Sequence, residues 1–189
     1  MTEVDVVIIG SGQAGAPLSW RLARNGRSVV LVERAELGGT CVNSGCTPTK
    51  TFIASAAAAQ AARRASVLGV DTGQVDVDLR RVVARKDDVV ETWRSGVASN
   101  IEDAGDRLRL VRGQGRFTAP RTVAVDGETF RAPIVIVNTG ARARIPDIPG
   151  LDTVPVLDNR TVMELQELPD HLVVVGGGFV GCELGQAYH

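Results

Sequence analysis

The segment at residues 10–15 reads G-S-G-Q-A-G, and it constrains the fold of this 189-residue chain more than any other feature. It follows residues 4–9, a short and mostly apolar run typical of a strand buried on both faces of a parallel sheet. Residues 14–25 then show helical spacing, and residues 28–32 form a second buried run. Strand, helix and strand within about thirty residues predict a right-handed βαβ unit.

Glycines at these spacings allow a tight turn and let a diphosphate approach the N-terminus of the following helix. Glu33 ends the second predicted strand 18 positions after Gly15, where a carboxylate can accept hydrogen bonds from a ribose hydroxyl. The alternative is a plain glycine turn beside a solvated glutamate. A dinucleotide site here would use Gly10, Gly12, Gln13, Ala14, Gly15 and Glu33.

Residues 176–181 repeat the motif as G-G-G-F-V-G after an apolar run at 172–175, which we expect to be a strand. Leu184 lies in the helix expected to follow. Two such motifs imply two dinucleotides, and a chain that needs both typically passes hydride between a nicotinamide and a flavin. The glycines of the second site would be Gly176, Gly178 and Gly181.

Cys41 and Cys46 lie five positions apart, the second at the expected start of a helix whose dipole favours a thiolate. A loop of this length can bring two sulfurs to bonding distance, so a redox dithiol is predicted. A zinc site would need further ligands, and only Cys182, His171 and His189 remain, so no metal site is predicted. Two inert thiols are the other alternative.

Lys50 follows Cys46 by four positions and therefore shares its helical face. Its ammonium group there would favour a thiolate or an anionic reduced flavin. A solvated lysine without a role is the alternative.

The remaining elements are predicted from periodicity. Thr47-Pro48 suggests a helix N-cap, with helical propensity through residues 53–65. Residues 78–104 form a long helix whose apolar stripe, Trp93 included, indicates core or a subunit contact. Residues 108–130 suggest an antiparallel β-meander with a hairpin turn at Asp126-Gly127, followed by a buried strand at 134–137.

A net charge of −1 and a pI near 6.1 exclude long-range attraction to nucleic acid or anionic membranes, so small molecules or proteins are the expected partners. The N-terminus has no signal-peptide pattern, and no segment reaches the ~20 apolar residues of a membrane span. A cytoplasmic location is expected, where three cysteines are more often catalytic than structural.

Residues 38–50, G-G-T-C-V-N-S-G-C-T-P-T-K, closely resemble the active-site signature of the class I pyridine nucleotide-disulfide oxidoreductases, which include glutathione reductase, dihydrolipoamide dehydrogenase and mercuric reductase. Residues 138–140 and 148–150 are similar to later segments of that family. The resemblance implies an α/β fold: a Rossmann-like FAD-binding domain with a parallel sheet and a small β-meander, plus the first strand of a second nucleotide-binding domain. The implied bounds are 1–150 for the FAD-binding domain, 151–170 for a connection and 171–189 for the start of an NAD(P)-binding domain.

The resemblance also implies roles for single residues. Cys41 would attack the substrate, Cys46 would lie against the flavin, and Lys50 would lie near the flavin and form a buried ion pair with Glu183. Phe179 stands where several members carry a tyrosine that gates the nicotinamide pocket. Further FAD-binding residues implied by the family are Gly39, Thr40, Gly115, Thr139 and Gly140.

The implied function is hydride transfer from NAD(P)H through FAD to the dithiol, and from there to a small disulfide, thiol or mercuric-type substrate in a homodimer. Ser44 and Thr47 depart from the aliphatic residues of many members, and the T-P-T-K version is nearer to the mercuric-reductase branch. Only one predicted strand follows Asp170, so we expect the chain to be truncated and inactive alone. The alternatives are a flavin enzyme with quinone or oxygen as acceptor, and a non-catalytic truncated product.

Overall fold

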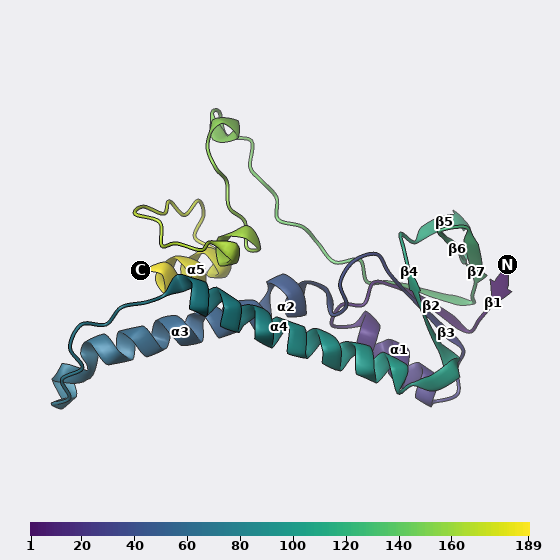
Figure 1. The fold of residues 1–189 in the computed structure, drawn as a ribbon. Helices are drawn as coiled ribbons and strands as arrows, with labels where there is room; N and C mark the ends of the chain where they lie inside the picture. Colours follow the sequence, from purple (N-terminus) through teal and green to yellow (C-terminus); the bar gives the residue numbers. More distant parts are fainter. The chain divides into compact units, whose positions relative to one another are not determined.

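The computed structural model describes residues 1–189, and its contacts divide the chain into two compact units (Figure 1). The first unit comprises Met1–Asn43 and Glu91–Arg142, and the second comprises Ser44–Val90 and Ala143–His189. The domain bounds predicted at residues 150 and 170 describe cofactor-binding domains, whereas the two units are defined by contacts. The predicted bounds therefore stay a prediction.

A four-stranded parallel sheet forms the centre of the first unit. Its order is β4-β3-β2-β8, and every neighbouring pair runs parallel. The two central strands, β2 and β3, are buried along their whole length, as their continuous apolar sequences predict. The strands are β2 (Val6–Ile9), β3 (Val29–Glu33), β4 (Leu108–Arg112) and β8 (Ile134–Val137).

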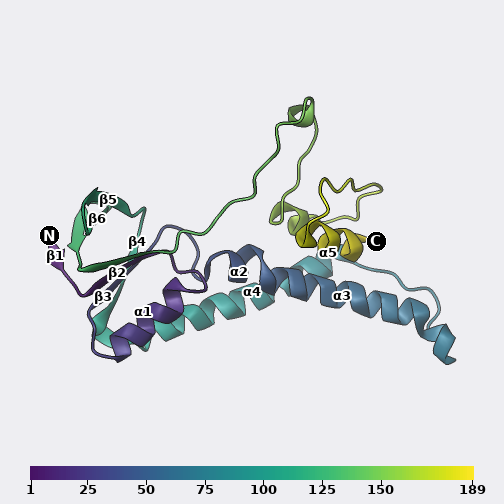
Figure 2. The ribbon, with the colours of Figure 1, turned by 180° about the vertical axis from the view of Figure 1, so that it is seen from behind.

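Helices cover one face of this sheet. Helix α1 (Gly15–Arg24) connects β2 to β3 and completes the predicted βαβ unit. Helix α4 (Leu79–Glu102) contributes its last turns, where Ile101 packs with Ala23 of α1 against the apolar side chains of β2 and β3. Figures 1 and 2 show α1 and the end of α4 side by side over the sheet.

A second sheet covers the other face and is the predicted meander. It has the order β1-β7-β6-β5, and Val123, Val125 and Phe130 from it join Val7 and Val30 in one buried cluster. A core therefore lies on each side of the parallel sheet. The strands are β1 (Thr2–Glu3), β5 (Arg116–Ala119), β6 (Thr122–Val125) and β7 (Glu128–Arg131).

The hairpin predicted at Asp126-Gly127 is confirmed. Val125 pairs with Glu128 across the turn, and both central residues have positive φ, 44° and 90°. Positive φ at both positions defines a type I′ turn, whose twist matches that of the two strands.

The predicted meander was wrong at its start, because residues 108–112 join the parallel sheet as β4. Leu108 belongs to the helix-side core and Val111 to the meander-side core, so the strand lies between the two layers. Arg109 and Arg112 are exposed on β4, which is an edge strand. Exposed charged residues between apolar ones are also typical of a solvent-facing meander strand.

The second unit is helical. Its long helix α3 (Cys46–Arg64) is followed by the 3-10 turn η1 (Ala65–Leu68), and the first half of α4 also belongs to this unit. The last helix, α5 (Phe179–Tyr188), packs on α3 through a ring contact between Tyr188 and Phe52. The other elements are the short helix α2 (Gly39–Ser44), which ends at the border between the units, and the 3-10 turns η3 (Leu151–Thr153) and η4 (Thr161–Glu164).

Three local predictions need correction. The strand expected at 172–175 does not form, because no other strand lies beside it to share a hydrogen-bond ladder. The helix begins at Cys46, as expected, but its N-cap is Gly45 rather than the predicted Thr47. Trp93 is 58% exposed, whereas Val83, Val90 and Ile101 of the same predicted stripe are buried.

None of the helices combines the length and the apolar character required to cross a membrane.

Candidate functional site

Glycine turns of the first unit meet at the carboxyl ends of the parallel strands. The turn at residues 10–15 joins β2 to α1 and folds tightly on itself, since a Cβ added at Gly15 would lie 1.9 Å from the carbonyl oxygen of Gly10. A Cβ at Gly10 would lie 2.2 Å from the carbonyl oxygen of Asn138, one residue beyond β8. Side chains at these two positions would collide with backbone, so glycine is required at both.

The turn at residues 38–40 lies directly against the first one. A Cβ added at Gly39, which has a φ of +61°, would be 2.6 Å from the Cα of Gly12. A Cβ at Gly140 would be 3.9 Å from the hydroxyl oxygen of Thr40. Three segments far apart in sequence thus come together, and they contain predicted site residues: Gly12, Gly39, Thr40, Thr139 and Gly140.

This glycine cradle, defined as the turns at residues 10–15, 38–40 and 138–140, fits a diphosphate. Gln13 and Ala14 are exposed at the N-terminus of α1, and the first turn of that helix carries no acidic residue. Unsatisfied backbone N–H groups and the helix dipole favour an anion at such a terminus. A Cβ added at Gly12 would lie 3.1 Å from the side-chain nitrogen of Asn138, a tight contact that glycine avoids.

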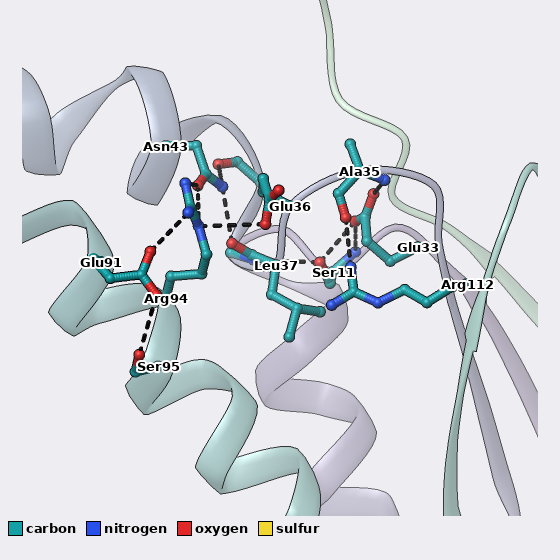
Figure 3. Close-up of polar contacts among 12 residues, drawn as sticks. Ser11, Glu33, Ala35, Glu36, Leu37, Asn43, Glu91, Arg94, Ser95 and Arg112 are labelled. Carbon is teal, nitrogen blue, oxygen red and sulfur yellow. Dashed lines mark hydrogen bonds and ion pairs between the residues drawn. The ribbon is translucent and has the colours of Figure 1, made fainter. Parts of the chain in front are cut away.

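Glu33 is buried and ends β3 beside this cradle (Figure 3). One of its oxygens, Oε2, accepts hydrogen bonds from the backbone N–H of Ser11 at 2.8 Å and from its hydroxyl at 2.7 Å, and Oε1 accepts one from the N–H of Ala35 at 2.9 Å. A carboxylate oxygen accepts about two hydrogen bonds, so Oε1 retains capacity for a ribose hydroxyl. The alternative of a solvated glutamate is therefore wrong.

The ionised form of Glu33 is favoured despite its burial. Burial raises the pKa of Glu33, but hydrogen bonds from Ser11, Ala35 and Arg34 together outweigh that effect and lower the pKa below its usual 4.5. A carboxylate held in its charged form accepts hydrogen bonds and repels a second negative group, such as a ribose 2′-phosphate.

Two polar residues of the cradle were missed as site residues. The hydroxyl of Ser11, besides donating to Glu33, accepts a hydrogen bond from the N–H of Gly38 at 3.3 Å. The amide nitrogen of Asn138 donates to the carbonyl of Gly10 at 3.4 Å. Both hydrogen bonds fix one turn relative to another. The sequence offers only weak signals for these residues: Ser11 is the variable residue of the G-x-G motif, and Asn138 directly follows the apolar run at 134–137.

A cavity of about 390 Å³ lies beside the first glycine turn, within the same unit. It is bounded by the start of α1, by Val42 of α2 and by the middle of α4, and its lining includes the indoles of Trp20 and Trp93. No charged side chain lines it.

The two predicted redox cysteines lie on consecutive helices. Cys41 is half-buried on α2, and Cys46 is exposed as the first residue of α3. The border between the two units falls between Asn43 and Ser44, inside this segment, so the pairing of the two sulfurs stays a prediction. Cys182 is exposed on α5, with its sulfur 3.7 Å from the carbonyl oxygen of Gly177.

The predicted ion pair between Lys50 and Glu183 is present, and it joins α3 to α5 within the second unit. It was predicted to be buried, and this part is wrong: the lysine side chain is 61% exposed and the glutamate side chain 38%. An exposed pair contributes little to stability, about 0–1 kcal/mol.

The remaining predicted residues take varied positions. Gly115 follows β4, and a Cβ there would meet the side chains of Ile9 and Val32 at 3.2 and 3.4 Å, which indicates close packing at the end of the sheet. Phe179 is exposed at the first position of α5. The glycines of the second motif surround this helix start, with Gly178 as N-cap, and they are Gly176, Gly178 and Gly181.

Comparison with known proteins agrees with the signature at residues 38–50. A mercuric reductase from Bacillus cereus is 36% identical over 188 residues, and a dihydrolipoyl dehydrogenase from Thermus scotoductus is 38% identical over 192. The match covers 99% and 100% of this chain but only 30% and 40% of those proteins.

The fold agrees with a solved structure as well. The copper(II) complex of the HOCl-induced flavoprotein disulfide reductase RclA from Escherichia coli superposes with a TM-score of 0.85 and 32% identity, over 100% of this chain and 40% of that one. These relatives are oxidoreductases, and the chain spans well under half the length of each. A family model, pyridine nucleotide-disulphide oxidoreductase, matches residues 4–189. With nearly its whole length matched, the chain belongs to the pyridine nucleotide-disulphide oxidoreductase family.

Proposed function

We propose that this chain supplies the FAD site and the redox-active dithiol of an NAD(P)H-dependent oxidoreductase acting on a disulfide or another thiophilic substrate. Enzymes of this family bind FAD and use NAD(P)H. The observation that carries the proposal is the close approach of the turns containing Gly12 and Gly39, next to the carboxylate of Glu33.

The residues of the first unit fit FAD in their chemistry. The glycine cradle would hold the diphosphate, because its glycines carry no side chains and the start of α1 carries no negative side chain. Glu33 would accept a hydrogen bond from the adenosine ribose through Oε1. Bound there, FAD would supply a two-electron carrier between a nicotinamide and a disulfide.

Cys41 and Cys46 are the proposed dithiol. Cys46 begins α3, where the helix dipole favours its thiolate, and Cys41 is the thiol that would attack the substrate. Attack on a substrate disulfide forms a mixed disulfide and releases one thiol. The second cysteine then displaces the other thiol, which leaves a Cys41–Cys46 disulfide, and two electrons and two protons return it to the dithiol.

Lys50 and Glu183 have a proposed role in tuning the cofactor rather than in stability. The ion pair holds the ammonium group of Lys50 one helical turn after Cys46. A positive charge in that place favours an anionic neighbour, either a thiolate or a reduced flavin. For the nicotinamide we propose the second glycine motif, with Phe179 as a mobile ring over the pocket.

The proposed substrates are small disulfides, thiols or mercuric-type ions, in keeping with the mercuric and lipoyl relatives. A homodimer in the cytoplasm is part of the same proposal. It rests on the family resemblance and on the use of cysteine for chemistry.

The proposal is tested by the absorbance of FAD-loaded protein during reduction by two electrons. We expect a long-wavelength charge-transfer band that Cys46→Ser abolishes, because the band requires a thiolate against the flavin. Cys182→Ser removes another exposed helical cysteine and is the matched control, which should keep the band. Reduction without the band, or a band that survives Cys46→Ser, contradicts the proposal. Turnover with quinone or oxygen that is unaffected by Cys41→Ser would favour the alternative acceptor.

A further inference from the structure

Arg94 and Asn43 form a polar connection between α4 and the segment that carries Cys41 (Figure 3). The guanidinium group of Arg94 donates two hydrogen bonds to Oδ1 of Asn43, from Nε at 3.1 Å and from Nη2 at 2.9 Å. The amide nitrogen of Asn43 donates to the carbonyls of Leu37 and Gly39, at 2.8 and 2.9 Å. One side chain therefore connects α4, the loop before α2 and the first residue of α2.

The orientation of the Asn43 amide follows from its partners. Arg94 can only donate hydrogen bonds, and the carbonyls of Leu37 and Gly39 can only accept them. Only a group with an acceptor on one side and a donor on the other satisfies both. An aspartate would pair with Arg94 but would turn a negative oxygen toward two carbonyl oxygens.

The charge of Arg94 is offset by neighbouring carboxylates. Glu91 accepts a hydrogen bond from Nη1 at 2.8 Å, and a carboxylate oxygen of Glu36 lies 3.5 Å from Nε. One cation with two anions leaves the cluster with a net negative charge, and Arg94 is 29% exposed. These carboxylates offset the positive charge that Arg94 would otherwise present to a thiolate, whereas its hydrogen bonds to Asn43 act on geometry.

Helix α2 needs an external contact to stay in place. It has six residues, and a helix this short is unstable alone because its nucleation cost is not recovered. Asn43 is two residues after Cys41 on this helix, so the hydrogen bonds that hold Asn43 also fix the backbone that carries the thiol.

We propose that Arg94 is a positioning residue for Cys41: through Asn43 it holds α2 against α4 and fixes the direction from which the thiol can be reached. This inference rests on the proposed function, in which Cys41 is the attacking thiol. It adds a residue outside the signature segment that acts without touching the substrate.

The test measures alkylation of Cys41 alone, in the chain with Cys46→Ser and Cys182→Ser, which leaves one thiol of three. The rate constant for reaction with iodoacetamide is measured against pH. Its high-pH plateau is the rate constant of the thiolate, and the midpoint of the curve is the pH at which half of the thiol is ionised. Arg94→Met and Arg94→Lys should each raise the plateau about fivefold or more, because a released α2 exposes the half-buried thiol, and should leave the midpoint in place. Lysine keeps the charge but cannot make both hydrogen bonds to one oxygen.

Arg80→Met is the matched control, since Arg80 lies on the same helix and pairs with exposed Glu167. Its plateau and midpoint should equal those of the chain that carries only Cys46→Ser and Cys182→Ser, the background protein. A plateau rate constant that is unchanged in both Arg94 variants overturns the proposal. The proposal also fails if Arg94→Met raises the midpoint pH while Arg94→Lys behaves like the background protein, because Arg94 would then act by its charge. If Arg94→Met fails to fold, as seen by circular dichroism, Arg94→Lys decides the question. The assay needs neither FAD nor turnover, so its result is independent of the absorbance test.

Discussion

Glu33 accepts three hydrogen bonds while only 8% of its surface is exposed, so its ionised form is both buried and hydrogen-bonded. A buried carboxylate without partners would take up a proton instead. The hydrogen bonds from Ser11 and Ala35 prevent this, and they connect the end of β3 to the first glycine turn. The residue proposed to bind ribose therefore also holds the cradle together.

The stability of the chain should depend on pH through Glu33. Since its folded pKa lies below the usual 4.5, the stabilisation is present above pH 4.5 and is lost as pH falls through the lower folded pKa. Glu33→Gln should lower the free energy of unfolding by about 1–3 kcal/mol at neutral pH and by less in acid. Urea unfolding at several pH values measures this. The control is Glu102→Gln at an exposed position. A loss of unfolding free energy in Glu33→Gln that becomes larger in acid would contradict the prediction.

At the scale of residues, the sequence predicted the glycines better than their polar neighbours. Gly12, Gly15 and Glu33 belong to a motif whose spacing is fixed by the turn itself. Asn138 contacts Gly10 from 128 positions away and Arg94 contacts Asn43 from 51 positions away, and no local spacing marks either residue. Their roles depend on which segments meet in space, which a single sequence does not state.

At the scale of elements, hydrophobic period identified the apolar strands of the first unit but not the short polar strand β1, nor every strand's partner. The run at 108–112 was predicted to be β-structure but in the wrong sheet, because an edge strand of a parallel sheet can carry exposed charged residues, as a meander strand does. The apolar run at 172–175 has strand composition, yet Val173 and Val175 are exposed and unpaired in a ladder. Pairing, rather than composition, decides whether such a run becomes a strand.

The first glycine turn should respond differently to substitution at each position. Gly15→Ala places a methyl group on the backbone oxygen of Gly10 and should destabilise the chain by more than about 2 kcal/mol. Gly12→Ala places its methyl group 3.1 Å from the side-chain nitrogen of Asn138 rather than on backbone, so we expect a smaller loss, about 1 kcal/mol. Its methyl group would still occupy the face that a diphosphate approaches, and FAD affinity should fall about tenfold or more.

Thermal unfolding and FAD titration measure the two effects separately. Gly26→Ala is the control, because its φ is +84° and nothing lies within 4 Å of an added Cβ. It should cost about 1 kcal/mol from backbone strain and leave FAD affinity unchanged. Gly12→Ala with undiminished FAD affinity would show that the diphosphate does not lie on this turn.

At the scale of the whole molecule, the two units differ in how much of them the sequence predicted. The first unit has the predicted layers, since strand periodicity and the βαβ signal are local and strong. The second unit was predicted only as separate helices and a strand. Its core joins residues more than a hundred positions apart, such as Phe52 and Tyr188, and periodicity does not reveal such partners.

Tyr188 reports on the packing of the second unit, because it is the only tyrosine of the chain. Its hydroxyl donates a hydrogen bond to the carbonyl of Val162, and burial raises the pKa of Tyr188 to about 12. Stabilisation by the neutral phenol is complete below pH 10 and is lost as pH rises toward 12. Ultraviolet titration of the phenolate should show this raised midpoint, and a midpoint near 10 in denaturant. A native midpoint near 10 would mean that α5 is not docked.

The glycine cradle has a consequence for how the protein is made. Its third turn follows β8, the strand that pairs with β2 from 128 positions further along the chain. A ribosome that has released only the first hundred residues has therefore produced a nucleotide motif without the segment that closes around it. Loading of the proposed FAD should therefore wait until residue 140 has emerged, and until then the apolar edge of β2 is open to other strands.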